Sequence, residues 1–356
     1  MKQLGPITML AAMLALGTAA FAQVSLTPDG KPAAKQEAPK EKKEPPKKSA
    51  APATPKPVPT PTPTPVAPPK AADSPFEDPN VDLVYGAYQR GQYKTAFDLA
   101  ITRAQYNGDP KAMTMLGELY ENGMGIKRDL AKAADWYKRA ADAGDREAMF
   151  ALAMMRLAGR GGAVNKEESV KLLASSAKLG NPKAAYNLAL LYLDGQTLPQ
   201  DVRRAAELLR VAADAGNPEA QYALATFYKE GNGVPKDQEK AVRLLQAASL
   251  AGNVDAEVEY AIAMFNGSGT PQNQPAAVAL LRKAARQNSA IAQNRLARVL
   301  ATGVGAAQDK VEALKWHLVA KTAGKGDPEL DELLSTLSAQ DRAKAEEAAR
   351  KWLGTK

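Results

Sequence analysis

Few side chains in this sequence could carry out catalysis. An enzyme commonly assembles a nucleophile, a general base and an orienting group, or a metal cluster, but the 356 residues include one histidine and no cysteine. His317 follows Trp316 at a place where equivalent segments of the chain have Tyr137 or a leucine. This pattern favours a core histidine over a catalytic base.

Other candidate chemical groups have simpler explanations. The carboxylate pairs Glu167-Glu168 and Glu346-Glu347 fall on predicted exposed helix faces, which is typical of solvated surface. The glycine-rich runs 159–162 and 231–233 are interpreted as turns, and the sequence has no P-loop motif. The absence of cysteine excludes disulfides, thiolate zinc sites and cysteine nucleophiles. We therefore expect a protein that is not an enzyme, with no metal site and no cofactor.

A repeated unit organises the chain. The stretch 217–252 recurs at a step of 36 residues, and each step ends on glycine except one, which ends on asparagine. These positions are Gly108, Gly144, Gly180, Gly216, Gly252, Asn288 and Gly324. Six complete copies follow one another without a gap, which predicts a solenoid rather than one compact domain.

Each unit carries two apolar stripes at helical spacing. In the fourth copy, Ala220 and Leu224 belong to the first stripe and Ala241 and Leu245 to the second. A glycine separates the stripes in all six copies and suits a helix end in a left-handed conformation, at Gly123, Gly159, Gly195, Gly231, Gly267 and Gly303. An Asp or Asn then follows where the second helix starts, and we expect it to cap that helix: Asp129, Asn165, Asp201, Asp237, Asn273 and Asp309.

These residues resemble a known family, the Sel1-like repeats, which are relatives of the tetratricopeptide repeat. The clearest match is residues 109–144, where MLGELYENGMGIKRDLAKAADWYKRAADAG is similar to the family pattern. The resemblance covers residues 109–324. It implies an all-α, right-handed superhelical α-solenoid of helix-turn-helix repeats, and it implies scaffold and signalling-adaptor roles.

The N-terminal residues predict export and a tether. Residues 1–22 have a basic start at Lys2, a short apolar run and Ala20-Phe21-Ala22, which is typical of a Sec-type signal peptide cleaved before Gln23. Residues 23–80 hold 16 of the 25 prolines and few large apolar residues, which indicates a disordered Pro/Lys-rich linker. We expect a periplasmic or secreted bacterial protein. A plain tether is favoured over a weak contact of the linker with anionic membrane or cell wall.

Charge argues against nucleic-acid binding. The net charge is +8, but Lys2 and the segment 23–75, with nine Lys and five Asp or Glu, account for five of these charges. About +3 is left for the residues from Phe76 onward, so the repeat region is close to neutral.

Both ends of the array have predicted caps. Residues 81–108 form a shorter helix pair, and residues 325–356 form two C-terminal helices. The first of these is expected to run from Pro328 through Leu337. Ser338 and Asp341 start the last helix as a capping box, and Ala343, Ala348 and Trp352 are expected to cover the sixth copy.

A binding surface is predicted on the first helices of the copies. In tetratricopeptide arrays these helices line a concave face, and the resemblance carries positions two, five, nine, twelve and thirteen of each helix onto it. The middle of this groove would be apolar and aromatic, and its ends more polar. Some of these residues could instead be buried by tight curvature, and Phe150, Tyr186 and Tyr222 fit either place. The candidate partner-binding residues are Phe150, Met154, Tyr186, Leu190, Leu193, Tyr222, Lys229, Ile262, Phe265 and Arg298.

Together these features predict a non-enzymatic scaffold or adaptor of the bacterial cell envelope that binds a peptide or protein in the groove. The alternative is a peptidoglycan-associated envelope protein. An envelope hydrolase is a third interpretation, but nothing in the sequence supplies its chemistry.

Overall fold

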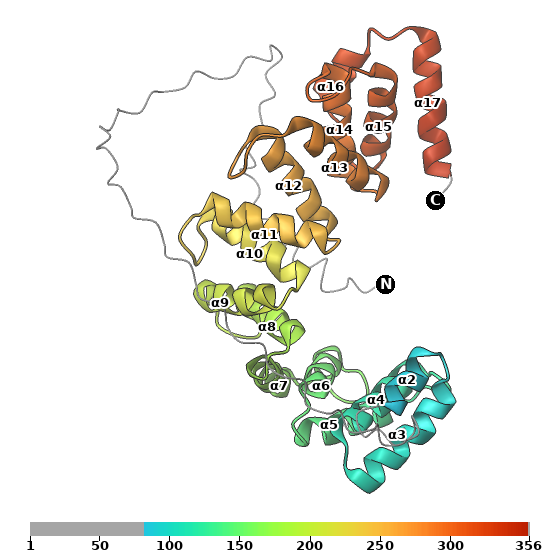
Figure 1. Cartoon of the computed structure of the whole chain (residues 1–356), viewed down its shortest axis with the longest axis vertical. Helices are drawn as coiled ribbons and strands as arrows, with labels where there is room; N and C mark the ends of the chain where they lie inside the picture. The colour runs from blue at the N-terminus through green and yellow to red at the C-terminus, as the bar shows by residue number, and fades with distance from the viewer. Residues whose placement is uncertain (1–81, 355–356) are drawn as a thin grey trace, which may run out of the picture. The chain divides into compact units, whose positions relative to one another are not determined.

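The computed structural model describes residues 82–354, which form 16 helices and no strand within that range (Figure 1). The predicted signal peptide and the linker lie outside the described residues. The helices are α2 (Leu83–Gln89), α3 (Tyr93–Asn107), α4 (Pro110–Asn122), α5 (Leu130–Asp142), α6 (Arg146–Ala158), α7 (Lys166–Lys178), α8 (Pro182–Asp194), α9 (Val202–Asp214), α10 (Pro218–Glu230), α11 (Gln238–Leu250), α12 (Val254–Asn266), α13 (Gln274–Arg286), α14 (Ala290–Thr302), α15 (Lys310–Thr322), α16 (Pro328–Leu334) and α17 (Ala339–Gly354).

The six copies are six helix pairs, from α4–α5 to α14–α15, in which every helix has 13 residues. Each helix packs against its neighbours in chain order (Figure 1). This confirms the all-α solenoid of helix-turn-helix units. The described chain also has a preceding pair, α2–α3, and two following helices, α16 and α17.

Capping side chains fix where the helices begin. The predicted acceptors before the second helices all bond a backbone N–H of the first turn; for example, Asp129 accepts from Lys132 and Asp237 from Lys240. The first helices are capped in the same way, by Asp109, Asp145, Asn181, Asn217, Asn253 and Ser289. The orphan N–H groups of each helix start are thereby satisfied.

Left-handed residues fix where the helices end. The turn glycines have φ between 64° and 83° and follow the first helices directly. Asn288, which replaces glycine in the column after the second helices, has φ 70° and is the single non-glycine residue with positive φ in residues 82–354. Asparagine tolerates this conformation better than most other residues, so the repeat keeps its geometry there.

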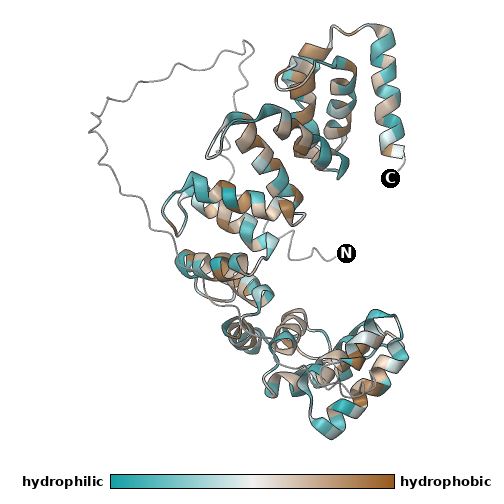
Figure 2. Ribbon diagram, viewed as in Figure 1, coloured by the Kyte–Doolittle hydropathy of each residue, from teal (hydrophilic) through white to brown (hydrophobic). Residues whose placement is uncertain are grey.

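The core lies between the helices and is built largely from alanine. The first alanine column, which includes Ala148, Ala184 and Ala220, is 0–3% exposed in all copies. Small side chains let the helices approach closely, and leucines such as Leu152 and Leu224 fill the remaining space. Figure 2 shows the resulting alternation of hydrophobic and hydrophilic stripes along the helices.

The C-terminal helices cover α15. Trp352 of α17 meets Trp316 of α15 edge to face, with ring centroids 5.2 Å apart. The buried residues of α17 are Ala345 and Ala349, whereas Ala343, which we expected on the covered face, is exposed. Helix α16 ends at Leu334 instead of Leu337. The prediction therefore holds for Trp352 and for the half-buried Ala348, and it is wrong for Ala343 and for the end of α16.

Candidate partner-binding surface

The predicted binding residues come from the first helices of the copies. We call the side chains at positions five, nine and twelve of α6, α8, α10, α12 and α14 the first-helix surface. Positions three and seven of the same helices belong to the core, as Ala148 and Leu152 of α6 show. The helical repeat therefore places the first-helix surface beside the core stripe. Most of its side chains stay partly accessible, but Tyr186, Val258, Phe265 and Ala301 are buried.

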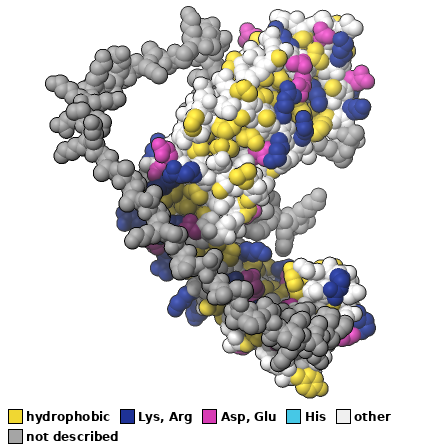
Figure 3. Space-filling model, viewed as in Figure 1, with side chains coloured by type: hydrophobic (Ala, Val, Ile, Leu, Met, Phe, Trp, Pro, Cys, Tyr) yellow, Lys and Arg dark blue, Asp and Glu magenta, His cyan; other side chains and the backbone are white. Residues whose placement is uncertain are grey.

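Most of the predicted residues are half-buried. They keep part of their surface accessible, and they are Phe150, Met154, Leu190, Leu193, Tyr222, Lys229, Ile262 and Arg298. Phe150, Leu190 and Leu193 pack with one side against the core of the middle copies. Tyr222 packs in the same way with Leu244 and Tyr260. Figure 3 shows hydrophobic side chains interspersed with charged ones on the visible face of the molecule.

Two predicted binding residues belong to the core instead. Tyr186 is 8% exposed and Phe265 is 7% exposed. Tyr186 packs among Ala185, Leu188 and Ala189, and its burial raises the pKa of its hydroxyl to about 12, with a contribution from nearby Glu219. The Phe265 ring lies against Gly305 in the turn of the next copy. Stacking of neighbouring copies thus covers both side chains.

Charged groups bridge neighbouring copies along the same surface. The Lys229 ammonium of α10 lies 2.8 Å from a carboxylate oxygen of Glu259 on α12. Glu259 also lies near the half-buried Tyr222, whose hydroxyl has a raised pKa because of burial and because of the charges of Glu259 and Asp255. Lys229 therefore takes part in an internal ion pair while keeping a third of its side chain exposed.

The N-terminal end of the array is polar, as predicted. The Tyr88 hydroxyl of α2 donates a hydrogen bond of 2.6 Å to Glu118 of α4. This hydrogen bond, together with burial and the charge of Glu118, raises the pKa of Tyr88 to about 12. Glu121, one turn further along α4, accepts from the Tyr137 hydroxyl at 3.0 Å and pairs with Arg160 at 3.0 Å.

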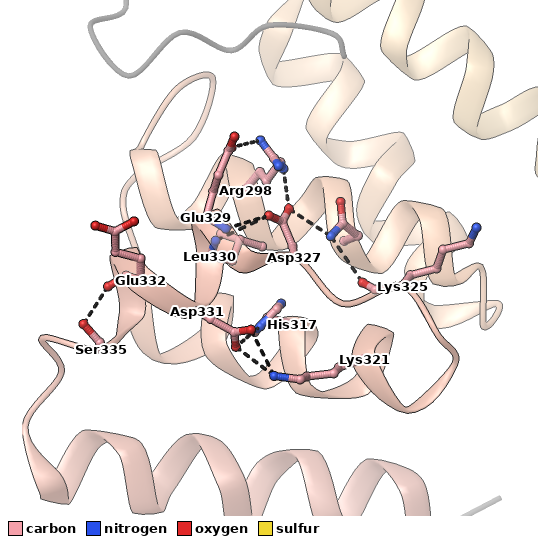
Figure 4. Close-up of polar contacts among 11 residues, drawn as sticks. Arg298, His317, Lys321, Lys325, Asp327, Glu329, Leu330, Asp331, Glu332 and Ser335 are labelled. Atoms are coloured by element: carbon pink, nitrogen blue, oxygen red, sulfur yellow. Dashed lines mark hydrogen bonds and ion pairs between the residues drawn. The ribbon is translucent and has the colours of Figure 1, made fainter. Parts of the chain in front are cut away.

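The C-terminal end is polar too (Figure 4). Arg298 of α14 lies 2.5 Å from Asp327 and 2.8 Å from Glu329, and the Asn294 amide donates to Asp327 at 3.1 Å. Burial alone would raise the pKa of Asp327, but the hydrogen bonds from Arg298 and Asn294 outweigh it and hold that pKa below its usual value. The guanidinium of Arg298 is thus occupied by two carboxylates of the chain itself.

His317 is a fully buried residue of α15, as the sequence indicated. Its Nε2 lies 2.8 Å from Asp331 Oδ1, and Lys321 contacts the same carboxylate at 3.0 Å (Figure 4). The hydrogen bonds to His317 and Lys321 lower the pKa of Asp331. His317 is separate from the first-helix surface, and residues 82–354 contain no group of three potential metal-ligating side chains.

Sequence reasoning missed two charged residues at position six of the first helices. Glu259 on α12 and Arg295 on α14 occupy a column that holds Ala151, Asn187 and Ala223 in the preceding copies. Both are half-buried. The sequence did contain a signal for these two residues, because Glu259 and Arg295 are opposite charges at the same position of adjacent copies. Neighbouring first helices place equivalent positions side by side.

Fold and surface together define an all-helical repeat protein whose copies can present variable side chains on a constant frame. Each of the six units is matched by the model of one family, described as the Sel1 repeat, over residues 110–145, 146–181, 182–217, 218–253, 254–289 and 290–325. The chain belongs to the Sel1-repeat family. Members of this family generally mediate protein–protein interactions and are typically non-catalytic scaffolds.

Solved structures agree with this assignment. The Sel1 repeat protein from Oxalobacter formigenes is 29% identical, with a TM-score of 0.60, and the match covers 68% of this chain and all of that one. The protein c5321, a protective antigen of uropathogenic Escherichia coli with an SLR fold, is 25% identical, with a TM-score of 0.53. That match covers 76% of this chain and 67% of the antigen. The comparison with curated proteins found no match.

Proposed function

We propose that this protein is a non-enzymatic scaffold or adaptor of the bacterial cell envelope that binds a peptide or a partner protein on its first-helix surface. The observation that carries the proposal is the row of half-buried apolar side chains on α6, α8, α10 and α12: Phe150, Met154, Leu190, Leu193, Tyr222 and Ile262.

These side chains have the properties of binding anchors. Packing on one side already holds them in place, so they lose little further side-chain entropy when a partner covers them. Covering the accessible apolar area is favourable by about 25 cal/mol per Å². Aromatic residues and methionine are enriched in protein interfaces, and an extended or helical peptide binds such anchors along a groove.

The assignment to the envelope rests on the first 22 residues. Their basic start, apolar run and Ala20-Phe21-Ala22 are the features that direct export and cleavage. No helix among residues 82–354 has the length and apolarity needed to cross a bilayer. Cell fractionation with N-terminal sequencing tests this part: a periplasmic or secreted form that begins at Gln23 supports it, and a cytoplasmic form that begins at Met1 contradicts it.

Photo-crosslinking inside the cell tests the binding surface. A photoreactive amino acid replaces Leu190 or Ile262 on the first-helix surface, and as a control Glu207 or Gln246 on the exposed faces of α9 and α11. We expect a defined protein adduct from the first pair of positions alone. Equal adducts from both pairs would contradict the proposal, and adducts of cell-wall fragments in place of a protein would favour the peptidoglycan alternative.

A further inference from the structure

Arg295 is an exception among the arginines of the described chain. Five arginines in residues 82–354 are half-buried, namely Arg103, Arg156, Arg282, Arg295 and Arg298. Four of them pair with a carboxylate: Arg103 with Asp109, Arg156 with Glu168, Arg282 with Glu312, and Arg298 with Asp327 and Glu329. For Arg295 the described residues supply no ion pair and no hydrogen bond to the guanidinium.

The carboxylates nearest to Arg295 are already engaged. Glu259, at the equivalent position of α12, is held by Lys229 at 2.8 Å, and Asp327 is held by Arg298 and Asn294. Arg298, one turn further along α14, adds a second positive charge nearby. Burial and the charge of Arg298 lower the pKa of Arg295, although Asp327 and Glu259 partly offset this effect. The surroundings therefore disfavour the isolated cation.

A half-buried cation without a partner costs free energy that a ligand anion can recover. We propose that Arg295, at position six of α14 and beside the first-helix surface, binds a carboxylate of the partner, and that it selects a linear peptide of a partner protein carrying an Asp or Glu beside an apolar residue. The planar guanidinium suits a carboxylate because it can donate two parallel hydrogen bonds. This inference deepens the proposed function and rests on it.

The apolar part of the ligand has a counterpart in Ile262 and Ile291. Ile262 is at position nine of α12, and Ile291, which is 45% exposed, is at position two of α14. The same two helix positions in α14 and the non-repeated helix α16 are those of Arg298 and Glu329, whose charged ends lie 2.8 Å apart. Ile291 and Arg295 are four residues apart on α14 and so share one face of that helix. Ile262 belongs to the preceding first helix, α12, and together the two isoleucines offer apolar surface near Arg295.

Selection from a displayed library of short random peptides tests this inference on the purified mature protein. The wild type is compared with Arg295→Glu, with Arg295→Gln, which removes the charge but keeps a polar side chain, and with Arg286→Glu. Arg286 is exposed at the end of α13, so that its reversal changes the net charge by the same amount outside the surface. Circular dichroism confirms that each variant is folded.

We expect peptides selected by the wild type and by Arg286→Glu to share an acidic residue next to an apolar one. Arg295→Gln should bind a selected peptide about tenfold or more weakly, as expected for losing a charge-assisted pair. Arg295→Glu should select a basic residue at that place. The inference is overturned if the selected peptides show no acidic preference, or if Arg295→Glu selects the same acidic peptides as the wild type. Either result would still be compatible with binding of a peptide to the first-helix surface. If the wild type selects no peptide at all, both this inference and the proposed function are overturned.

Discussion

The ring of Tyr137 on α5 lies where a side chain on Gly117 of α4 would stand. A Cβ atom built on Gly117 would come within 2.5 Å of two Tyr137 ring atoms. In copies two to five the same two positions hold alanine and leucine, for example Ala153 with Leu173. The first copy therefore replaces an Ala/Leu pair with a Gly/Tyr pair, which keeps the two helices of the unit close together.

Replacing Gly117 by alanine should destabilise the protein. The added methyl group overpacks the contact with Tyr137, which costs about 1 to 3 kcal/mol, and the better helix propensity of alanine returns about 1 kcal/mol at most. Because the added Cβ would overlap the ring deeply, the upper half of the overpacking range applies. We expect a net loss of about 1 to 2 kcal/mol in the free energy of unfolding, measured by urea titration.

The double variant Gly117→Ala, Tyr137→Leu is the control for this prediction. It restores the pair of the other copies, so it should be more stable than the sum of the two single changes implies. The double-mutant cycle measures this coupling. Strictly additive losses would show that the two side chains do not share one space.

The ion pair between Asp327 and Arg298 should make the C-terminal end sensitive to acid. Because the pKa of Asp327 is lower in the folded chain than its unfolded value of about 3.9, this carboxylate contributes stability that is fully present above that value. The contribution is lost as the pH falls through the folded pKa. Thermal unfolding followed from neutral pH to below pH 4 measures the loss.

Asp327→Asn isolates this effect, because asparagine also caps a helix start and caps several first helices here. At neutral pH we expect it to be less stable by about 1 to 3 kcal/mol, with the difference shrinking in acid. Glu329→Gln, whose side chain is 70% exposed in the wild type, should change little. A difference for Asp327→Asn that does not depend on pH would contradict the ion-pair explanation.

His317→Leu should leave the fold and its stability nearly unchanged. Leucine stands at this column in four other copies, and Asp331 stays bonded to Lys321 when the imidazole is removed. The imidazole Nδ1 has no hydrogen-bond partner among the described residues, so removing it leaves no other buried group without a hydrogen bond. We expect a change within about 1 kcal/mol and a pKa of Asp331 that rises toward its ordinary value, measured by NMR titration. Loss of partner binding in a stable variant would contradict the structural role of His317.

Periodicity made the frame of the fold predictable. Glycine columns, alanine columns and capping residues each recur six times. The structure of a copy with an unusual residue can therefore be predicted from the other copies. Asn288 shows this: the missing glycine was visible in the sequence, and the structure has the same left-handed turn there. The non-repeated end lacked this check, and the register of Ala343 in α17 was wrong.

The surface was less predictable than the frame. A helical position defines a direction, but the exposure of a side chain there depends on how closely the next copy packs. For this reason Phe150 and Tyr186, both at position five of their helices, look equivalent in sequence, yet Tyr186 is buried while Phe150 stays half-buried. Arg295 was visible in the sequence as a charge in an otherwise mostly uncharged column, but its lack of an ion-pair partner could be recognised only once the partners of the neighbouring carboxylates were known.

Partner capture by a paired set of variants tests most directly whether the first-helix surface binds a partner. Leu190→Asp with Tyr222→Ala alters that surface, and Val211→Asp with Leu250→Ala makes similar changes on the second helices, where the native residues are 46% and 83% exposed. With both proteins folded by circular dichroism, we expect the first to lose the envelope partners that the wild type captures after crosslinking, and the second to keep them. A folded Leu190→Asp, Tyr222→Ala protein that captures the same partners as the wild type would contradict the proposed function.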